Sequence, residues 1–254
     1  MFKRITFIES THSYLIDGNS TNCPSVTQLI KKFKKPFEKE RMARMVANKT
    51  GSTSEQVKRE WDQNNLFSTT LGSMLHKYIE NFYNGKRLPF DGDLKNLKNE
   101  QKEQIIEVFP KLTKQFHNFA KTNHCLHSIK NEFVVGDLND TNICGMLDML
   151  CYNSETDEIE ILDFKTNKKM AKESRYGKLL SPFDDMSEGE INEYTIQLNV
   201  YKYIIEKHTS LKISKMKIIW INRNNDEYQM FELDHIQDKI AQMFDCFRLK
   251  HKPS

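Results

Sequence analysis

No stretch of the sequence stays apolar for the roughly 20 residues that a membrane-spanning helix needs. The opening segment, MFKRITFIESTHSYLIDG, also lacks the apolar core of a secretory signal and the arginine-rich, acid-poor pattern of a transit peptide. Its alternating apolar residues lead to Asp17-Gly18, which predicts a β-hairpin instead. We therefore expect a protein that has no membrane partner, is not secreted and works in the reducing compartment where it is made.

Cysteines are few and widely scattered along the chain. There are five: Cys23, Cys125, Cys144, Cys151 and Cys246. An odd number at irregular spacing argues against a disulfide framework, so we expect the cysteines to serve as small buried hydrophobic residues. The segment His124 to His127, HCLH, has no second ligand pair at the distance that a zinc finger requires.

Several catalytic motifs are missing as well. The sequence has no G-x-x-x-x-G-K-[ST] loop and therefore no ATP-driven motor of that kind. It also has no G-x-S-x-G nucleophile motif and no pair of histidines placed for an iron oxygenase. A composition of 38% hydrophobic and 29% charged residues, with a net charge of +3, is typical of a globular protein. This charge permits nucleic-acid binding without requiring it.

The hydrophobic pattern changes character once along the chain. Before residue 125 it has helical spacing, and it then alternates as in strands. The predicted helices cover 24–33, 52–61, 69–85, 99–123, 191–208 and a last segment that ends near Lys250. The predicted strands cover 127–138, 143–153 and 158–166, and a hairpin covers 215–233. We expect one α/β domain with a central mixed sheet between helices, built from an N-terminal hairpin and helical part (1–125) and a core (126–254).

Three local signals refine this prediction. Ser52 with Glu55 forms a capping-box pattern that would start a helix, and Gly85 would end the next one. Pro110 predicts a kink or a break in the helix over 99–123. Residues 167–190 have little periodicity, which predicts either a functional loop or a short helix.

The most informative segment is EIEILDFKTNKK, residues 158–169, because Asp163 and Lys165 stand at the end of an apolar strand. Residues two apart in a strand project to the same side. Asp148 interrupts the preceding strand, and the turn NSETDE between the two strands predicts an antiparallel hairpin that brings Asp148 close to Asp163. Clustered carboxylates suit Mg²⁺ or Mn²⁺, and the lysine could orient or deprotonate a water. The alternative is an ordinary salt bridge at the edge of a sheet.

The segments GMLDML and EIEILDFKTNKK, with fourteen residues between Asp148 and Asp163, resemble the core motif of the PD-(D/E)XK nucleases, and in particular their RecB-like branch. LGSMLHKYIE resembles the helix of this branch that carries a glycine and a metal-binding histidine, here His76. YTIQLNVYKYIIE resembles its Gln-x-x-x-Tyr motif, here Gln197 and Tyr201. HSYLIDGNSTNCPSVTQLI resembles the N-terminal region of viral and phage members. These matches occur in the right order and span most of the chain.

The resemblance implies a restriction-endonuclease-like fold and one or two Mg²⁺ or Mn²⁺ ions. The implied metal ligands are His76, Asp148, Asp163 and the backbone carbonyl of Phe164. Gln197 and Tyr201 would hold the substrate or Lys165, and Glu132 matches a glutamate one strand before the catalytic hairpin. Some relatives carry an iron–sulfur cluster with three late cysteines. Only Cys246 follows the Gln-Tyr helix here, so we expect no such cluster.

Other residues are candidates from the sequence itself. Glu80 lies one helical turn after His76 and could orient it, or could simply be solvated. Gly72 would permit a close approach between this helix and another element. Four basic residues follow the predicted strand and could contact a phosphate backbone or keep the loop soluble: Lys168, Lys169, Lys172 and Arg175.

We therefore expect a metal-dependent nuclease that hydrolyses single- or double-stranded DNA. By analogy with the RecB-like branch, it would be an exonuclease acting on DNA ends in recombination, repair or replication, with partner proteins from those processes. It would work in the cytoplasm of a bacterium or of a virus-infected host cell. Two alternatives stay open: a nuclease-fold module that binds DNA without cutting it, and a structural or assembly protein with chance motif matches. The motifs leave the oligomeric state undetermined.

Overall fold

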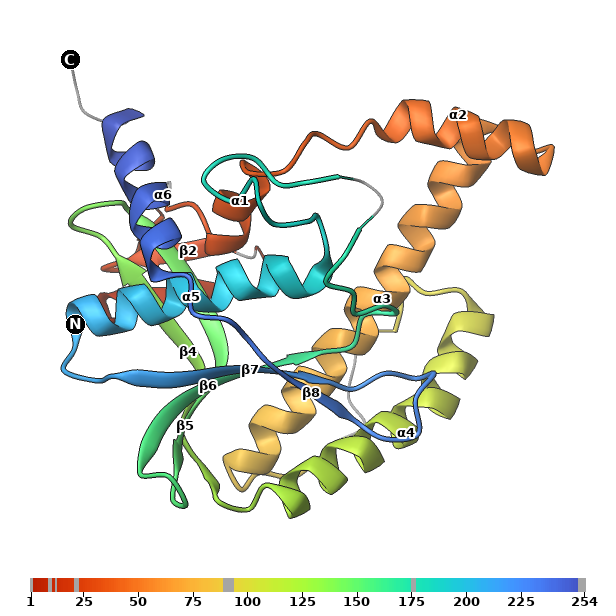
Figure 1. Cartoon of the computed structure of the whole chain (residues 1–254). Coiled ribbons are helices and arrows are strands. Elements are labelled where there is room, and N and C mark those ends of the chain that lie inside the picture. Colours follow the sequence, from red (N-terminus) through yellow and green to blue (C-terminus); the bar gives the residue numbers. More distant parts are fainter. Residues whose placement is uncertain are drawn as a thin grey trace.

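The computed structural model describes residues 2–8, 11, 13–20, 23–88, 94–174 and 177–250. A five-stranded mixed sheet forms the centre, in the order β4-β5-β6-β7-β8 (Figure 1). Its strands are β4 Leu126–Asp137, β5 Ile143–Asn153, β6 Glu158–Lys165, β7 Ile213–Trp220 and β8 Gln229–Glu232. Only β6 and β7 pair in parallel. The predicted α/β class with a central mixed sheet is confirmed.

Helices cover both faces of this sheet (Figure 1). The helical elements are η1 Phe2–Arg4, α1 Val26–Lys31, α2 Lys39–Thr50, α3 Ser54–Tyr83, α4 Asn99–Thr122, α5 Glu190–His208 and α6 Gln237–Lys250. Helices α1, α5 and α6 share one hydrophobic core with the sheet, while α3 and α4 share a second core on its other face. Among the described residues, no helix has both the length and the apolar character that crossing a membrane would require.

The N-terminal strands form a small separate sheet, β1 Ile5–Ile8, β2 Ser13–Ile16 and β3 Asn19–Ser20. Asp17 and Gly18 have positive φ angles of 50° and 78° and form the tight turn between β2 and β3. This backbone shape matches the twist of a two-residue hairpin, which confirms the turn that the sequence predicts.

Two predictions about the helices are wrong. The helices predicted over 52–61 and 69–85 form one continuous helix, α3, which is capped by Thr53 with Gln56 rather than by Ser52 with Glu55. Burial of apolar residues such as Val57 and Phe67 explains why the helix continues through the polar stretch between the two segments. Helix α2 was not predicted, because its buried residues are only two alanines.

Pro110 does not break α4, which runs from Asn99 to Thr122. Proline removes one backbone hydrogen bond, but Phe109 and Leu112 on either side of it are buried and hold the helix against the core. Residues 167–189 contain no helix in their described part, so the prediction of a loop holds there.

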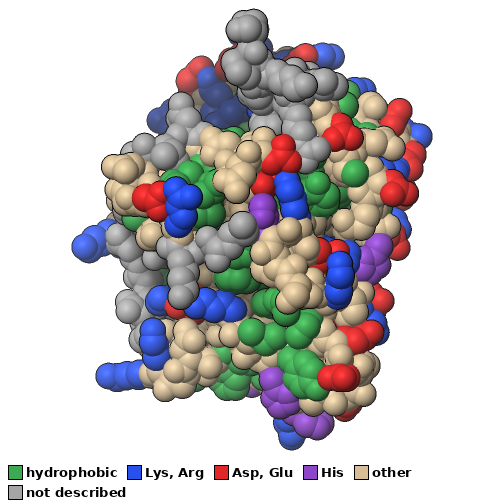
Figure 2. Space-filling model, turned by 90° about the vertical axis from the view of Figure 1, so that its left-hand side faces the viewer, with side chains coloured by type: hydrophobic (Ala, Val, Ile, Leu, Met, Phe, Trp, Pro, Cys, Tyr) green, Lys and Arg blue, Asp and Glu red, His purple; other side chains and the backbone are tan. Residues whose placement is uncertain are grey.

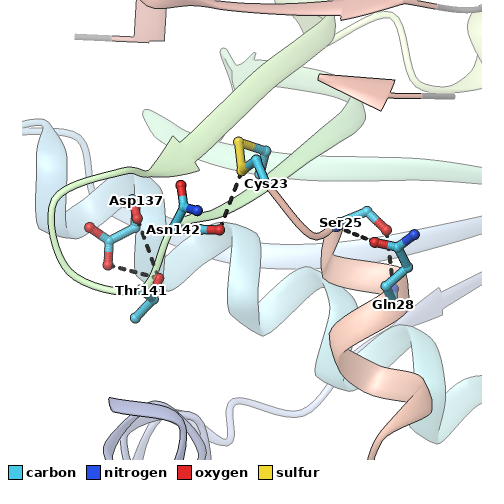
Figure 3. The surroundings of a disulfide bond; sticks show 7 residues. Cys23, Ser25, Gln28, Asp137, Thr141 and Asn142 are labelled. Carbon is cyan, nitrogen blue, oxygen red and sulfur yellow. Dashed lines mark hydrogen bonds between the residues drawn. A yellow bond between two sulfur atoms is a disulfide. The ribbon is translucent and has the colours of Figure 1, made fainter. Parts of the chain in front are cut away.

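Cys23 and Cys144 form a disulfide (Figure 3), which overturns the expectation that all five cysteines are free. The amide of Cys144 donates to the carbonyl of Pro24 over 3.1 Å, so the segment before α1 runs beside the start of β5. The disulfide joins residues 121 positions apart and therefore left no local signal in the sequence. Disulfides are rare in reducing compartments, so the pairing also runs against that expectation.

The three remaining cysteines differ in exposure. Cys151 is buried, as predicted for a small hydrophobic residue, whereas Cys125 is partly buried and Cys246 is exposed.

We predict that alkylation of the unfolded, unreduced protein modifies three cysteines, and that prior reduction raises this number to five. Reduction should also lower the free energy of unfolding by about 2–4 kcal/mol, because the bond closes a long loop in the unfolded chain. Mass spectrometry counts the adducts, and denaturant titration measures the stability. Five adducts without reduction would contradict the pairing.

Candidate metal centre

The register of three neighbouring strands places three carboxylates in one row. Met149 on β5 lies opposite Leu162 on β6, so the next pair outward in this antiparallel register is Asp148 and Asp163. Between β4 and β5, Phe133 lies opposite Leu147, which sets Glu132 opposite Asp148. Residues directly opposite in an antiparallel pair project to the same side of the sheet. The hairpin proximity predicted for Asp148 and Asp163 follows from this register.

Helix α3 adds an imidazole to the row. His76 Nδ1 lies 3.4 Å from Asp148 Oδ1. One ligand atom each from His76, Glu132 and Asp148 lies within 4.8 Å of the other two, and no other group of this kind occurs among the described residues. A nitrogen donor with carboxylate oxygens suits Mn²⁺ or Mg²⁺. The structure therefore brings together a donor set that could hold a divalent cation, and it gives Glu132 a more central place than the sequence did.

Gly72 explains how α3 comes so close to the sheet. A Cβ atom at this position would lie 3.3 Å from Thr166 Oγ1, just after the end of β6. The missing side chain lets the helix pass tightly over the strand end that carries Asp163 and Lys165. His76 follows one helical turn later. The close approach that the sequence predicts is therefore confirmed, and it sets the position of the imidazole.

Lys165 forms an ion pair with Asp163, whose side chain is only 2% exposed. The Lys165 ammonium also lies 5.0 Å from the centre of the Tyr194 ring on α5. An aromatic face attracts a cation at this distance. Tyr194 is not among the residues predicted from the sequence, although it precedes Tyr201 by seven residues, which places both on the same side of α5.

Asp148 is held by the backbone of the next strand. The amide of Phe164 donates a hydrogen bond of 2.6 Å to Asp148 Oδ2. The regular pairing of β5 with β6 ends at Met149 and Leu162. The Phe164 N–H therefore has no backbone carbonyl of β5 to donate to, and the Asp148 carboxylate accepts its hydrogen bond instead. The role of the Phe164 carbonyl as a metal ligand stays a prediction.

The three carboxylates of the row do not ionise easily together. Burial raises the pKa of Glu132 to about 8, and the charge of Asp148 adds to this effect. Burial also raises the pKa of Asp163 to about 6, again with Asp148 adding to it and with Lys165 opposing it. Neighbouring carboxylates resist ionising together unless a cation compensates them. A divalent cation would supply that compensation, so the electrostatics of the site fit the donor set.

Asp148 and His76 behave differently from Glu132 and Asp163, because the two lie beside each other and carry opposite charges. Burial alone would raise the pKa of Asp148, but the charges of His76 and Lys165 outweigh it, and the pKa is lowered. Burial lowers the pKa of His76, but Asp148 more than reverses this and raises it to about 9. This raised pKa favours the imidazolium form of His76 at neutral pH, and its charge partly compensates the carboxylates.

Glu132 also has an unusual backbone. Its φ angle is +45°, in the left-handed region that non-glycine residues seldom adopt. Such conformations cost of order 1–3 kcal/mol and cluster at functional sites. The backbone of β4 therefore departs from the extended conformation at the residue that it contributes to the row.

Gln197 and Tyr201 are buried beside the site but contact each other. The Gln197 side-chain amide donates to the Tyr201 hydroxyl over 2.9 Å. A side chain at Gly145 on β5 would overlap the Tyr201 ring, so the tyrosine packs directly on this strand. Burial raises the pKa of Tyr201, and the charge of Asp163 contributes, which keeps the phenol neutral. The pair buttresses β5 and lies within electrostatic reach of Asp163.

The remaining candidates are less central. Glu80 accepts a hydrogen bond of 2.7 Å from Lys77, and its charge contributes to the raised pKa of Glu132. Lys168 and Lys169 are exposed directly after β6. Lys172 pairs with Asp234 at 3.1 Å. Arg175 lies outside the described residues.

Comparisons with known proteins add little to this geometry. No family model matches the chain, and no curated protein matches it. Among solved structures, one similar chain is titled "Crystal structure of SSO0001", with 14% sequence identity and a TM-score of 0.30. The alignment covers 59% of this chain and 61% of that chain. The description of the site therefore rests on its own residues.

We predict that Glu132→Gln makes the metal-free protein more stable at pH 8 but not at pH 5. The folded-state pKa of about 8 lies above the ordinary value of 4.5, so the stability that this group contributes is present below pH 4.5 and is lost as the pH rises through 8. The gain at pH 8 should be on the order of 1 kcal/mol or more. Denaturant titration across this pH range measures it.

Glu103→Gln, on the exposed side of α4, serves as the control and should run parallel to the wild type. Millimolar Mg²⁺ should stabilise the wild type more than Glu132→Gln, because the ligand binds the folded state. Parallel pH profiles for all three proteins, with and without Mg²⁺, would contradict the charge imbalance.

Proposed function

We propose that the protein is a divalent-metal-dependent nuclease whose centre resembles that of the RecB-like PD-(D/E)XK enzymes. The observation that supports this most is the row of Glu132, Asp148 and Asp163 across three adjacent strands, with His76 against Asp148 and Lys165 against Asp163. A chance motif match would leave the two aspartates apart. The two aspartates instead take opposite positions in the β5–β6 register, which supports a shared site.

The residues present fit Mg²⁺ or Mn²⁺. His76, Glu132, Asp148 and Asp163 would hold the ion or ions. A bound divalent ion supplies a water of lowered pKa and stabilises negative charge on a phosphate. No iron–sulfur cluster is part of the proposal.

Lys165 would act as a fixed positive charge. Burial lowers its pKa, but Asp163 and Asp148 outweigh this effect and raise the pKa above its ordinary value. The ammonium therefore stays protonated and is suited to orienting the attacking water and contacting a phosphate oxygen, rather than to removing a proton. Asp163 and the Tyr194 ring hold it in place.

The substrate in this proposal is DNA. Lys168 and Lys169 follow the catalytic strand at the surface, where they can contact the phosphate backbone. By analogy with the RecB-like branch, the activity would be exonucleolytic, on DNA ends in recombination, repair or replication, with partner proteins from those processes and a location inside a cell.

We predict that the protein cuts end-labelled DNA with Mg²⁺ or Mn²⁺ and not with EDTA. Asp148→Asn, Asp163→Asn and Lys165→Ala should each lower the cleavage rate by about 100-fold or more, because each removes a charge that the reaction needs. Linear and closed circular substrates, each single- and double-stranded, separate exonuclease from endonuclease activity by gel analysis.

Two matched variants control for general effects of charge. Asp157→Asn lies in the turn at the other end of the β5–β6 hairpin, and Lys114→Ala lies on the surface of α4. Both should retain wild-type cleavage. Binding of every substrate without cleavage under either metal would favour a non-cutting DNA-binding module. Absence of both binding and cleavage would favour a structural role.

We also predict that Tyr194 positions Lys165. Tyr194→Leu removes the aromatic face and should lower kcat roughly 10-fold with little change in KM, whereas Tyr194→Phe keeps the face and most of the rate. Steady-state kinetics on a short oligonucleotide measures both constants. Equal losses in the two variants would assign the effect to the hydroxyl and contradict the ring contact.

A further inference from the structure

A second concave site lies away from the metal centre. It is a cavity of about 580 Å³ between the end of α3, the end of α4 and the start of β4. Its lining residues are Phe82, Tyr83, His117, Lys121, His124 and His127, with smaller contributions from Ala120, Asn123, Leu126 and Ser128. The face in Figure 2 carries histidine side chains beside hydrophobic ones along its lower rim, the end where α3 and α4 reach β4 in Figure 1.

The lining of this cavity holds basic side chains and no acidic ones. It contains one ammonium group, that of Lys121, and three imidazoles, and no carboxylate. The histidines do not form a metal centre, since the one described group with three convergent ligand atoms is that of His76. They are anchored separately: His117 Nε2 lies 2.8 Å from the Tyr78 hydroxyl, and His127 Nε2 lies 3.2 Å from Ser154 Oγ. One ammonium group and imidazole N–H donors spread around a cavity suit a phosphate group rather than a metal ion.

Part of the lining is aromatic and adjoins the basic residues. The Phe82 and Tyr83 rings meet edge to face with centroids 5.2 Å apart, and Phe82 also packs on His117 at 5.5 Å. Flat rings beside basic groups combine two features that a nucleotide needs, a stacking surface for its base and cations for its phosphate. A cavity of this size falls in the range of small-molecule sites.

We infer that this cavity binds a nucleoside monophosphate unit. The base stacks on the aromatic part, and Lys121 with the histidines holds the phosphate. The unit can be a free nucleotide or the end of a nucleic-acid strand, which share this chemistry. The cavity and the metal centre are distinct but share α3, since the rise along this helix from His76 to Phe82 is about 9 Å. The inference goes beyond the proposed nuclease activity and does not depend on it.

The test follows the histidine ring protons by NMR in metal-free protein with EDTA, while thymidine monophosphate is added. Histidine→Gln variants assign the signals. The expected result is a saturable shift of His117, His124 and His127 with little change at His76, and binding at least 10-fold tighter than that of thymidine or inorganic phosphate.

Lys121→Glu should weaken this binding at least 10-fold. Lys114→Glu, two turns earlier on α4 and outside the cavity, should leave it unchanged. Circular dichroism and unfolding curves check that both variants fold, and His124→Gln provides a second variant with a milder change. Cleavage activity is not needed for this readout, so failure of the proposed nuclease would not affect it.

A phosphorylated oligonucleotide separates the two sources. Weakened binding of both mononucleotide and oligonucleotide in Lys121→Glu assigns the cavity to a strand end, and weakened binding of the mononucleotide alone assigns it to a free nucleotide. Equal affinity for inorganic phosphate and thymidine monophosphate would overturn the inference, as would shifts confined to His76 or binding that Lys121→Glu leaves intact.

Discussion

The electrostatic cost of placing three carboxylates side by side governs the arrangement around the sheet. Glu132, Asp148 and Asp163 lie on adjacent strands; Asp163 is buried, and Glu132 and Asp148 are partly buried. Partly buried negative charges at this spacing destabilise the fold unless cations or hydrogen bonds offset them. Lys165, His76 and the Phe164 amide offset part of this charge. Burial, together with the charge of Asp148, still raises the pKa of Glu132 and of Asp163. The three carboxylates are therefore ionised together only with a further cation, which is the physical reason to expect a metal ion.

Both faces of the sheet contribute to this compensation. Helix α3 belongs to the core on one face and brings His76 over the strand end, which the small size of Gly72 permits. Helix α5 belongs to the core on the other face and places Tyr194 against Lys165. The strand that carries Asp148 is fixed near its start, where Cys144 joins Cys23 and Tyr201 packs on Gly145. The site is thus held by elements from the whole length of the chain.

The parts of this site that sequence could predict are those set by short-range periodicity. Asp163 and Lys165 share a side because strands alternate, and Asp148 comes opposite Asp163 because a polar turn joins their strands. Glu132 was a weaker candidate, since its place depends on the pairing of β4 with β5 and on a left-handed backbone that no motif announces. The Tyr194 contact and the Cys23–Cys144 bond depend on tertiary packing over long separations, which local patterns do not encode. The cap at Thr53 was missed by one residue because two overlapping capping patterns compete there.

If the row of Glu132, Asp148 and Asp163 binds a divalent metal, anomalous X-ray diffraction from crystals of the protein grown with Mn²⁺ will locate the ion without reference to any activity. We expect an anomalous peak within bonding distance of Asp148 and of Asp163 or Glu132, with His76 turned towards it as a neutral ligand. A well-ordered site without a peak at saturating Mn²⁺, with Lys165 and protonated His76 as its only cations, would show that these carboxylates do not hold a metal.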